Sequence, residues 1–165
     1  MLQFSAYSAI KILRTQAWDI LDKHIVNGFK NVQKNTYLLG RWMTLGQSPS
    51  VICDTGHNVD GIKIVVEQIK KTSYNELHIV FGVVNDKSID SILKLLPKKA
   101  QYYFCQAQIP RAMHVDLLFT KAQENQLTGN CFKSVSDAFK KAKSVAKEND
   151  LIFIGGSTFV VAEII

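Results

Sequence analysis

The chain has 165 residues, of which 47% are hydrophobic, and its 20 Lys and Arg against 14 Asp and Glu give a formal net charge of +6. A chain of this length and apolar content can bury a full core without disulfides or a structural metal, which excludes an intrinsically disordered protein. Its apolar runs are far shorter than the roughly 20 residues of a membrane-spanning helix, and residues 1–12 lack a cleavable signal pattern, so we expect a soluble, cytoplasmic protein without a membrane partner.

Residues 1–40 are predicted to form two short helices with no strand between them. Apolar residues recur at helical spacing in both, and Gly28 lies near the end of the second helix. The first pattern comprises Ala6, Ala9, Ile10 and Leu13, and the second comprises Trp18, Leu21 and Ile25. Nothing local covers these apolar faces, so we expect this segment to belong to a larger protein.

From residue 41 onward, short apolar runs alternate with amphipathic stretches, which is typical of repeated strand–helix units. The runs are mostly continuous, as in strands buried on both faces of a parallel sheet. They comprise residues 51–53, 78–84, 102–105, 131–132 and 151–154, and residues 42–45 are predicted to add an edge strand. Helical spacing predicts helices around residues 59–69, 89–96, 115–122 and 138–145. The pattern predicts an α/β, Rossmann-like three-layer domain with a mostly parallel sheet over residues 41–165, preceded by the short helical segment of residues 1–40.

Neither the lysines nor the cysteines indicate a special partner. The lysines are scattered over several predicted elements instead of being gathered with aromatic residues into one groove, so we expect no nucleic-acid binding. Cys53, Cys105 and Cys131 are widely spaced and form no C-x-x-C pair. We therefore predict three reduced core cysteines and no disulfide or zinc site.

Polar turns follow the predicted strands at the edge of the sheet where ligands of open α/β folds bind. The most informative turn is Asp54-Thr55-Gly56-His57-Asn58, in which Asn58 is a good helix N-cap. It places a carboxylate, an imidazole and the free N–H groups of a helix start on one rim, a combination that suits a phosphate, a carboxylate or metal-bound water. A purely structural role, with Asp54 and Asn58 as caps and His57 in solvent, accounts for these residues equally well.

Three further turns carry weaker signals. Asp86 and Lys87 fit an N-cap and a surface charge as well as they fit a site. Arg111 follows a strand and could clamp a carboxylate in bidentate fashion. Ser157 follows two glycines and is placed to start the last helix. The chain contains no G-x-x-x-x-G-K-[ST] P-loop and no G-x-G-x-x-G after its first strand, so alone it cannot cradle a triphosphate in either usual way.

These turns occur in the order and approximate spacing of a known family. The matching segments are Gly40-Arg41-Trp42, Asp54-Thr55-Gly56-His57-Asn58, Gly82 with Asp86-Lys87, Pro110-Arg111-Ala112 and Gly155-Gly156-Ser157. They resemble the carboxy-terminal domain of folylpolyglutamate synthase, called dihydrofolate synthase in its bifunctional form, within the Mur ligase superfamily. The D-x-x-H-N turn preceded by G-R-W is the most specific part, and the resemblance covers essentially the whole chain.

The resemblance implies a two-domain enzyme that uses ATP and Mg²⁺ to activate a carboxylate of dihydropteroate or a folate as an acyl phosphate, to which glutamate is then joined. Residues 1–40 resemble the helical tail of the ATP-binding domain. The P-loop and the magnesium ligands would lie outside this sequence, with no metal ligand within it. We therefore expect a piece of a longer, monomeric ligase that is inactive alone.

The resemblance also implies roles for particular residues. Arg41 is similar to the linker arginine that reaches ATP phosphates, and Asp54 to the aspartate that contacts the nucleotide. His57 is similar to the catalytic histidine associated with glutamate binding, and Asn58 supports its turn. Arg111 and Ser157 are further candidates for substrate binding.

Two other functions fit the same residues. The D-x-x-H-N turn does not fix the acceptor, so another Mur-type ligase, such as a peptidoglycan amino-acid ligase, is one alternative, although the G-R-W segment favours the folate branch. A stand-alone Rossmann-like module that binds a small anion or a protein and catalyses nothing is the other.

Overall fold

Two units of structure follow one another along the chain. The structure, a computed structural model, describes residues 2–85 and 89–165, and for residues 2–4 and 33 it describes the backbone only. The contacts divide the chain into Met1–Leu39 and Gly40–Ile165. This boundary lies one residue before the boundary expected from the sequence. Asp86 and Lys87, singled out above, lie outside the described residues.

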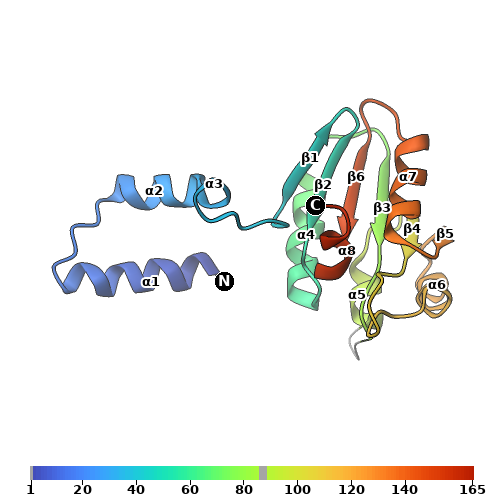
Figure 1. The fold of residues 1–165 in the computed structure, drawn as a ribbon, viewed down its shortest axis with the longest axis horizontal. Coiled ribbons are helices and arrows are strands. Elements are labelled where there is room, and N and C mark those ends of the chain that lie inside the picture. Colours follow the sequence, from blue (N-terminus) through green and yellow to red (C-terminus); the bar gives the residue numbers. More distant parts are fainter. Residues whose placement is uncertain (1, 86–88) are drawn as a thin grey trace. The chain divides into compact units, whose positions relative to one another are not determined.

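The first unit is helical. It contains α1 (Leu2–Thr15), α2 (Asp22–Lys30) and α3 (Val32–Thr36), which Figure 1 shows in blue. The first agrees with the predicted helix, whereas the second begins at Asp22, so that Trp18 and Leu21 of its predicted pattern lie ahead of it. The third was not predicted, because a helix of only five residues is too short to show an apolar period.

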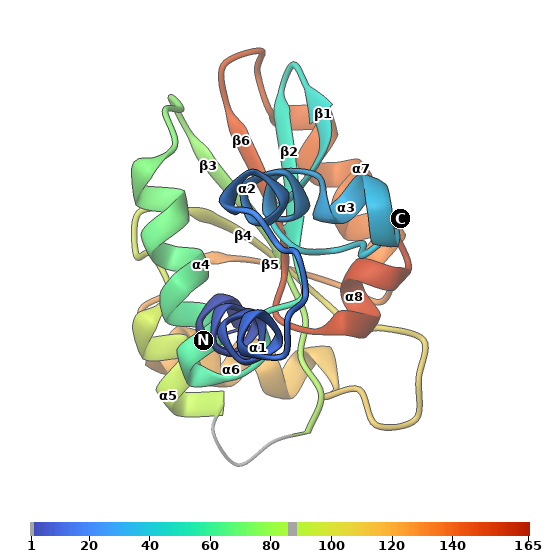
Figure 2. The same ribbon diagram turned by 90° about the vertical axis from the view of Figure 1, so that its left-hand side faces the viewer.

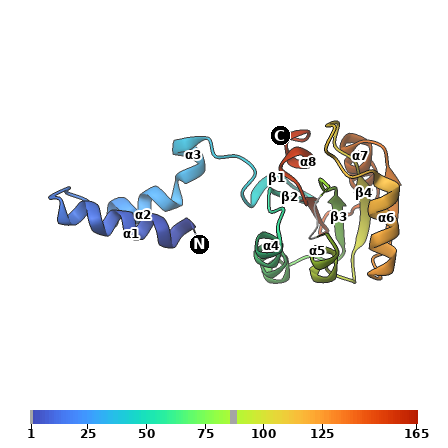
Figure 3. The same ribbon diagram turned by 90° about the horizontal axis from the view of Figure 1, so that it is seen from below.

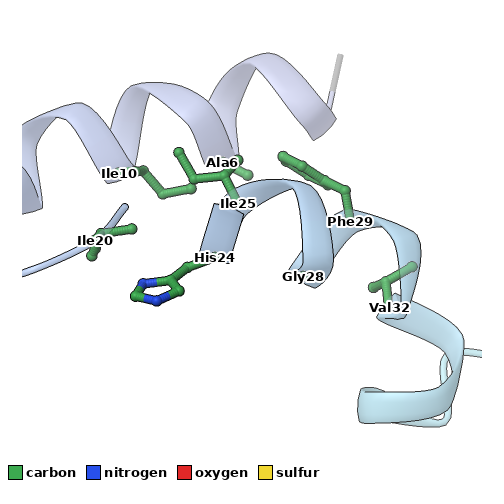
Figure 4. Close-up of a pocket in the computed structure, with 8 residues that line it drawn as sticks. All are labelled: Ala6, Ile10, Ile20, His24, Ile25, Gly28, Phe29 and Val32. Carbon is green, nitrogen blue, oxygen red and sulfur yellow. The ribbon is translucent and has the colours of Figure 1, made fainter. Parts of the chain in front are cut away.

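The apolar side chains of this unit are only partly covered. α1 and α2 contribute to an apolar pocket, whose lining Figure 4 shows: Ala6, Ile10, Ile20, His24, Ile25, Gly28, Phe29 and Val32. Most of the large apolar side chains that are exposed in the described residues belong to this unit, among them Trp18 at 62% exposure. None of the helices in the described part of the chain is long and apolar enough to cross a membrane.

The second unit is built on a six-stranded sheet with the order β1-β2-β6-β3-β4-β5. The strands are β1 (Met43–Gln47), β2 (Ser50–Asp54), β3 (Leu77–Phe81), β4 (Gln101–Cys105), β5 (Gly129–Phe132) and β6 (Leu151–Gly155). Neighbouring strands are parallel except for β1, which pairs with β2 in antiparallel fashion at one edge. β3 is shorter than the predicted run because the chain leaves the sheet after Phe81, and Val84 forms an isolated bridge with Ala112.

Helices cover both faces of this sheet. One face is covered by α4 (Val59–Lys71), α5 (Ile89–Leu95) and α6 (Val115–Glu124), and the other by α7 (Val135–Val145) and α8 (Thr158–Ala162), as Figure 3 shows. Figure 2 shows the same division, with α4 on one side of the strands and α7 and α8 on the other. The predicted α/β three-layer fold with a mostly parallel sheet is confirmed.

Burial in the sheet explains the continuous apolar runs. β3 and β6 are buried along their whole length because helices cover both of their faces. The prediction for the cysteines is correct for Cys53 and Cys105, which are buried, and wrong for Cys131, which is exposed. Cys131 lies on β5, an edge strand with a single neighbour, so its side chain is less covered.

The topology makes two connections diverge at the carboxyl ends of β2 and β6. These strands are parallel neighbours, with Asp54 paired to Gly155. The chain leaves β2 toward α4 on one face and leaves β6 toward α8 on the other face. Ligands of open α/β sheets bind where successive connections diverge in this way. The segments 54–58 and 155–157 therefore meet at the place where a site is expected.

Candidate functional site

The loop after β2 presents His57 and Asn58 to solvent above a buried base. Asp54 and Thr55 are each only 8% exposed. The Asn58 side chain caps α4 by accepting a hydrogen bond from the Gly61 N–H at 2.8 Å, as predicted from the sequence. The cap fixes the point at which the loop becomes a helix, and thereby the position of the preceding residue, His57.

The ring of His57 is oriented by the backbone of its own loop. Its Nδ1 lies 2.9 Å from the Thr55 carbonyl oxygen. Since a carbonyl oxygen only accepts, this contact assigns the proton of the neutral ring to Nδ1. Nε2 then keeps its lone pair and can accept a hydrogen bond from a bound amine or ammonium group.

The carboxylate of Asp54 joins this loop to the segment ahead of β1. One oxygen, Oδ1, accepts from the Gly56 N–H at 2.7 Å, and the other, Oδ2, accepts from the Trp42 N–H at 2.8 Å. In addition, the Thr55 N–H donates to the Gly40 carbonyl at 2.8 Å. The Gly40-Arg41-Trp42 turn is therefore bound to the D-x-x-H-N loop at two points.

Arg41 lies between these two attachment points. Its own side chain is exposed, while the next residue, Trp42, packs on Phe153 of β6 with ring centroids 6.2 Å apart. The structure thus brings Arg41, Asp54 and His57 to the same rim of the sheet, although Arg41 lies ahead of the first strand in the sequence.

The loop after β6 lies beside the loop after β2, because the strands that precede them are parallel neighbours. Ser157 is buried and caps α8 by accepting a hydrogen bond from the Phe159 N–H at 3.2 Å, as the sequence predicted. Gly156 has φ +93, and a Cβ there would lie 2.5 Å from the Phe81 ring. Only glycine allows this loop to turn so closely over β3.

Arg111 reaches this region from the loop between β4 and α6. Its guanidinium lies 5.5 Å from the centroid of the Phe159 ring, and its carbonyl accepts from the Asn85 N–H at 3.1 Å. Arg111 is therefore placed between the loop after β3 and the start of α8. Phe159 was not singled out in the sequence. The sequence feature that could have identified it is an aromatic residue two positions after the predicted helix start at Ser157.

The exposed residues Arg41 and Arg111 and the capped starts of α4 and α8 lie on this rim, and cations and helix starts of this kind favour an anion. It offers no obvious place for a metal: within residues 2–85 and 89–165, no group of three or more His, Cys, Asp or Glu side chains is arranged to hold an ion. The described residues thus do not form a magnesium site of their own.

Comparison with known proteins identifies the family of this chain. The family described as "Mur ligase, glutamate ligase domain" matches residues 40–158. The chain belongs to this family. The match spans nearly the whole second unit, so the glutamate ligase domain begins at the glycine of the G-R-W segment.

The chain as a whole has relatives with folate-related names. It is 28% identical over 158 residues to a probable bifunctional folylpolyglutamate synthase/dihydropteroate synthase of Haloferax volcanii. It is 27% identical over 164 residues to the dihydrofolate synthase/folylpolyglutamate synthase of Escherichia coli. The alignments cover 94% and 98% of this chain but only 18% and 37% of those two proteins.

Solved structures agree with these matches. Escherichia coli FolC in complex with DHPP and ADP matches the glutamate ligase domain and its helical segment with a TM-score of 0.80 and 25% identity, over 94% of this chain and 36% of that one. The resemblance to the carboxy-terminal domain of folylpolyglutamate/dihydrofolate synthases, stated from the motifs, is confirmed by all three comparisons.

Proposed function

We propose that this domain is the carboxy-terminal part of an ATP-dependent ligase that joins glutamate to dihydropteroate or to a folate. The observation that carries the proposal is the gathering of the G-R-W turn, the D-x-x-H-N loop and the G-G-S loop at one rim of the sheet. The names of its relatives support the substrate class. The whole protein would be cytoplasmic and monomeric, with neither nucleic acid nor membrane as a partner.

The chemistry divides into two steps. In the first, a carboxylate oxygen of the acceptor attacks the γ-phosphorus of ATP, and ADP leaves. In the second, the glutamate amine attacks the acyl carbon, phosphate leaves, and the amine loses a proton. A cation near the transferred phosphoryl group offsets developing charge, and holding the amine beside the acyl phosphate makes its attack effectively unimolecular.

The residues of the rim suit these tasks. Arg41 would contact the ATP phosphates, and the Nε2 lone pair of His57 would orient the amino group of glutamate. Asn58 would hold the His57 loop in place. Arg111, stacked on Phe159, and Ser157 would bind the glutamate carboxylates.

The groups that bind the triphosphate and Mg²⁺ would come from sequence outside these residues. The 165 residues contain no P-loop motif, and the described ones contain no metal cluster, so the nucleotide cradle and the ligands of Mg²⁺ are assigned to an ATP-binding domain. Residues 1–40 would be the tail of that domain. On this proposal the domain alone does not turn over ATP.

The test is a product assay on the two-domain protein in which this domain follows its ATP-binding domain. ATP, Mg²⁺ and labelled glutamate are supplied with dihydropteroate, with a folate, or with a peptidoglycan precursor as acceptor. We expect a glutamyl product with dihydropteroate or folate. Product only with the peptidoglycan precursor would place the domain in another branch of the family, and no product with any acceptor would refute a ligase.

A further inference from the structure

We propose that Asp54 is a positioning residue: its carboxylate fastens the Gly40-Arg41-Trp42 turn to the loop after β2 and so holds Arg41 at the rim. The inference rests on the proposed function for the role of Arg41 at the phosphates. It assigns to Asp54 an action through the backbone, beyond what the family resemblance implies for this residue.

The carboxylate of Asp54 is fully engaged with the backbone. Both oxygens of Asp54 accept backbone N–H groups, from Gly56 in its own loop and from Trp42, which precedes it by 12 residues. Hydrogen bonds to an ionised acceptor are stronger than neutral ones, and burial strengthens them further. An asparagine offers only one acceptor oxygen, so its amide group would face one of the two donors and break one of the two bonds.

The backbone of the Gly40-Arg41-Trp42 turn has an unfavourable conformation that its contacts must maintain. Gly40 has φ +71 and Trp42 has φ +43, both in the left-handed region. A tryptophan adopts that region only when its surroundings hold it there. Three contacts do so: the bond from the Trp42 N–H to Asp54, the bond from Thr55 to the Gly40 carbonyl, and the packing of the Trp42 ring on Phe153.

Gly40 fits tightly against its neighbours. A Cβ at this position would lie 2.7 Å from Thr55 Cγ2 and 3.1 Å from Val161 Cγ1. The turn therefore lies directly against the loop after β2 and against α8. Since both neighbours of Arg41 are attached, its Cα has a fixed position relative to His57, and Arg41 moves with the glutamate ligase domain.

A double-mutant cycle in the two-domain enzyme tests this role. The variants are Asp54→Asn, Arg41→Ala and the pair, and the readout is kcat/KM for ATP at saturating glutamate and acceptor. We expect Asp54→Asn alone to lower kcat/KM by about 10- to 100-fold, and by less than about threefold when Arg41 is already alanine. An equal loss in both backgrounds would overturn the proposal, because Asp54 would then act on the nucleotide itself.

Asp60→Asn, on the exposed first turn of α4, is the matched control and should leave kcat/KM unchanged.

A second readout uses the 165-residue chain and needs no activity. In amide hydrogen exchange, Asp54→Asn should speed exchange of the Trp42 N–H by about 10-fold or more, while the amides of β3 and β6 keep their protection. Unchanged protection of Trp42 would contradict the proposal. If the variant loses the protection of β3 and β6, Gly40→Ala takes its place in both experiments, since it strains the turn and leaves the carboxylate intact.

The two experiments separate the inference from the proposed function. A wild-type enzyme that forms no glutamyl product would refute the ligase, and the exchange experiment would still test the attachment by Asp54. If the wild-type enzyme is active and the losses of kcat/KM caused by Asp54→Asn and Arg41→Ala are additive, the attachment by Asp54 is refuted. The proposal of a ligase is then unaffected.

Discussion

At the scale of single residues, the sequence was most informative where a residue's role is local. Asn58 and Ser157 were recognised as helix caps because a cap needs only a short polar side chain ahead of an amphipathic stretch. The partners of Asp54 were not predictable, because Trp42 is brought to it only by the pairing of β1 with β2. The same holds for the contact of Arg111 with Phe159, which joins segments far apart in the chain.

The three cysteines should differ sharply in reactivity. Burial raises the pKa of the Cys53 thiol to about 11, with a smaller effect of Asp54, and burial raises the pKa of Cys105 as well. Cys131 is exposed, and its pKa is raised, first by partial burial and then by Asp116. Because the thiolate is the reactive form, a disulfide reagent at pH 8 should modify one thiol of the folded chain, and all three in urea.

The control for this prediction is Cys131→Ser. This variant should show no fast-reacting thiol while folded. If instead two or more thiols of the wild-type chain react at the fast rate, the burial of Cys53 and Cys105 described here is wrong.

At the scale of elements, continuous apolar runs located the parallel strands well, since burial on both faces leaves little room for polar residues. The short helix α3 and the early end of β3 escaped prediction, because both depend on how the chain turns and not on an apolar period. The antiparallel edge strand β1 was expected near residues 42–45 and occupies Met43–Gln47.

Two glycine substitutions test the packing of these elements. They are expected to change the free energy of unfolding in different directions. Gly156→Ala should destabilise the domain by about 2 kcal/mol or more, because it places a Cβ against the Phe81 ring at positive φ. Gly28→Ala should be neutral or stabilising by up to about 1 kcal/mol, because Gly28 is helical, near the end of α2, and a Cβ there meets no atom within 4 Å. Urea unfolding of both variants is the measurement. A Gly156→Ala variant as stable as wild type would show that the turn after β6 is not as tight as described.

At the scale of the whole domain, a buried polar cluster ties together the amino ends of the strands, opposite the candidate site. Asp150 accepts from the Lys147 N–H at 2.7 Å and from the Glu76 N–H at 3.1 Å, and it lies 3.4 Å from Nε2 of His78. The other ring nitrogen of His78 lies 3.1 Å from the Tyr103 hydroxyl. The cluster links β3, β4 and the turn before β6. It was not predicted, because its members are isolated polar residues in the sequence.

This cluster should make stability depend on pH. The bond from the Lys147 N–H, with those from Glu76 and His78, lowers the pKa of Asp150 below its ordinary value. A carboxylate with a lowered pKa stabilises the fold above the unfolded-state pKa of about 4, and this contribution is lost as the pH falls through the folded-state value. Asp150→Asn should therefore cost about 1–3 kcal/mol at pH 6 and less at about pH 3.

Urea unfolding of wild type and Asp150→Asn at both pH values checks this prediction. The exposed Asp137→Asn variant, at the start of α7, serves as the control for the loss of one negative charge. A cost of Asp150→Asn that grows toward acid pH would contradict the assignment of a lowered pKa.

The measurement that tests the account most directly is the KM for glutamate of the two-domain enzyme with His57→Ala. The proposed function places the glutamate amine at Nε2 of His57, at the carboxyl ends of β2 and β6. His57→Ala should therefore raise the KM for glutamate by about 10-fold or more, with a much smaller change in the KM for the acceptor. His114→Ala, which removes an exposed histidine at the start of α6, should change neither value. Equal KM values for glutamate in wild type and His57→Ala would contradict the account.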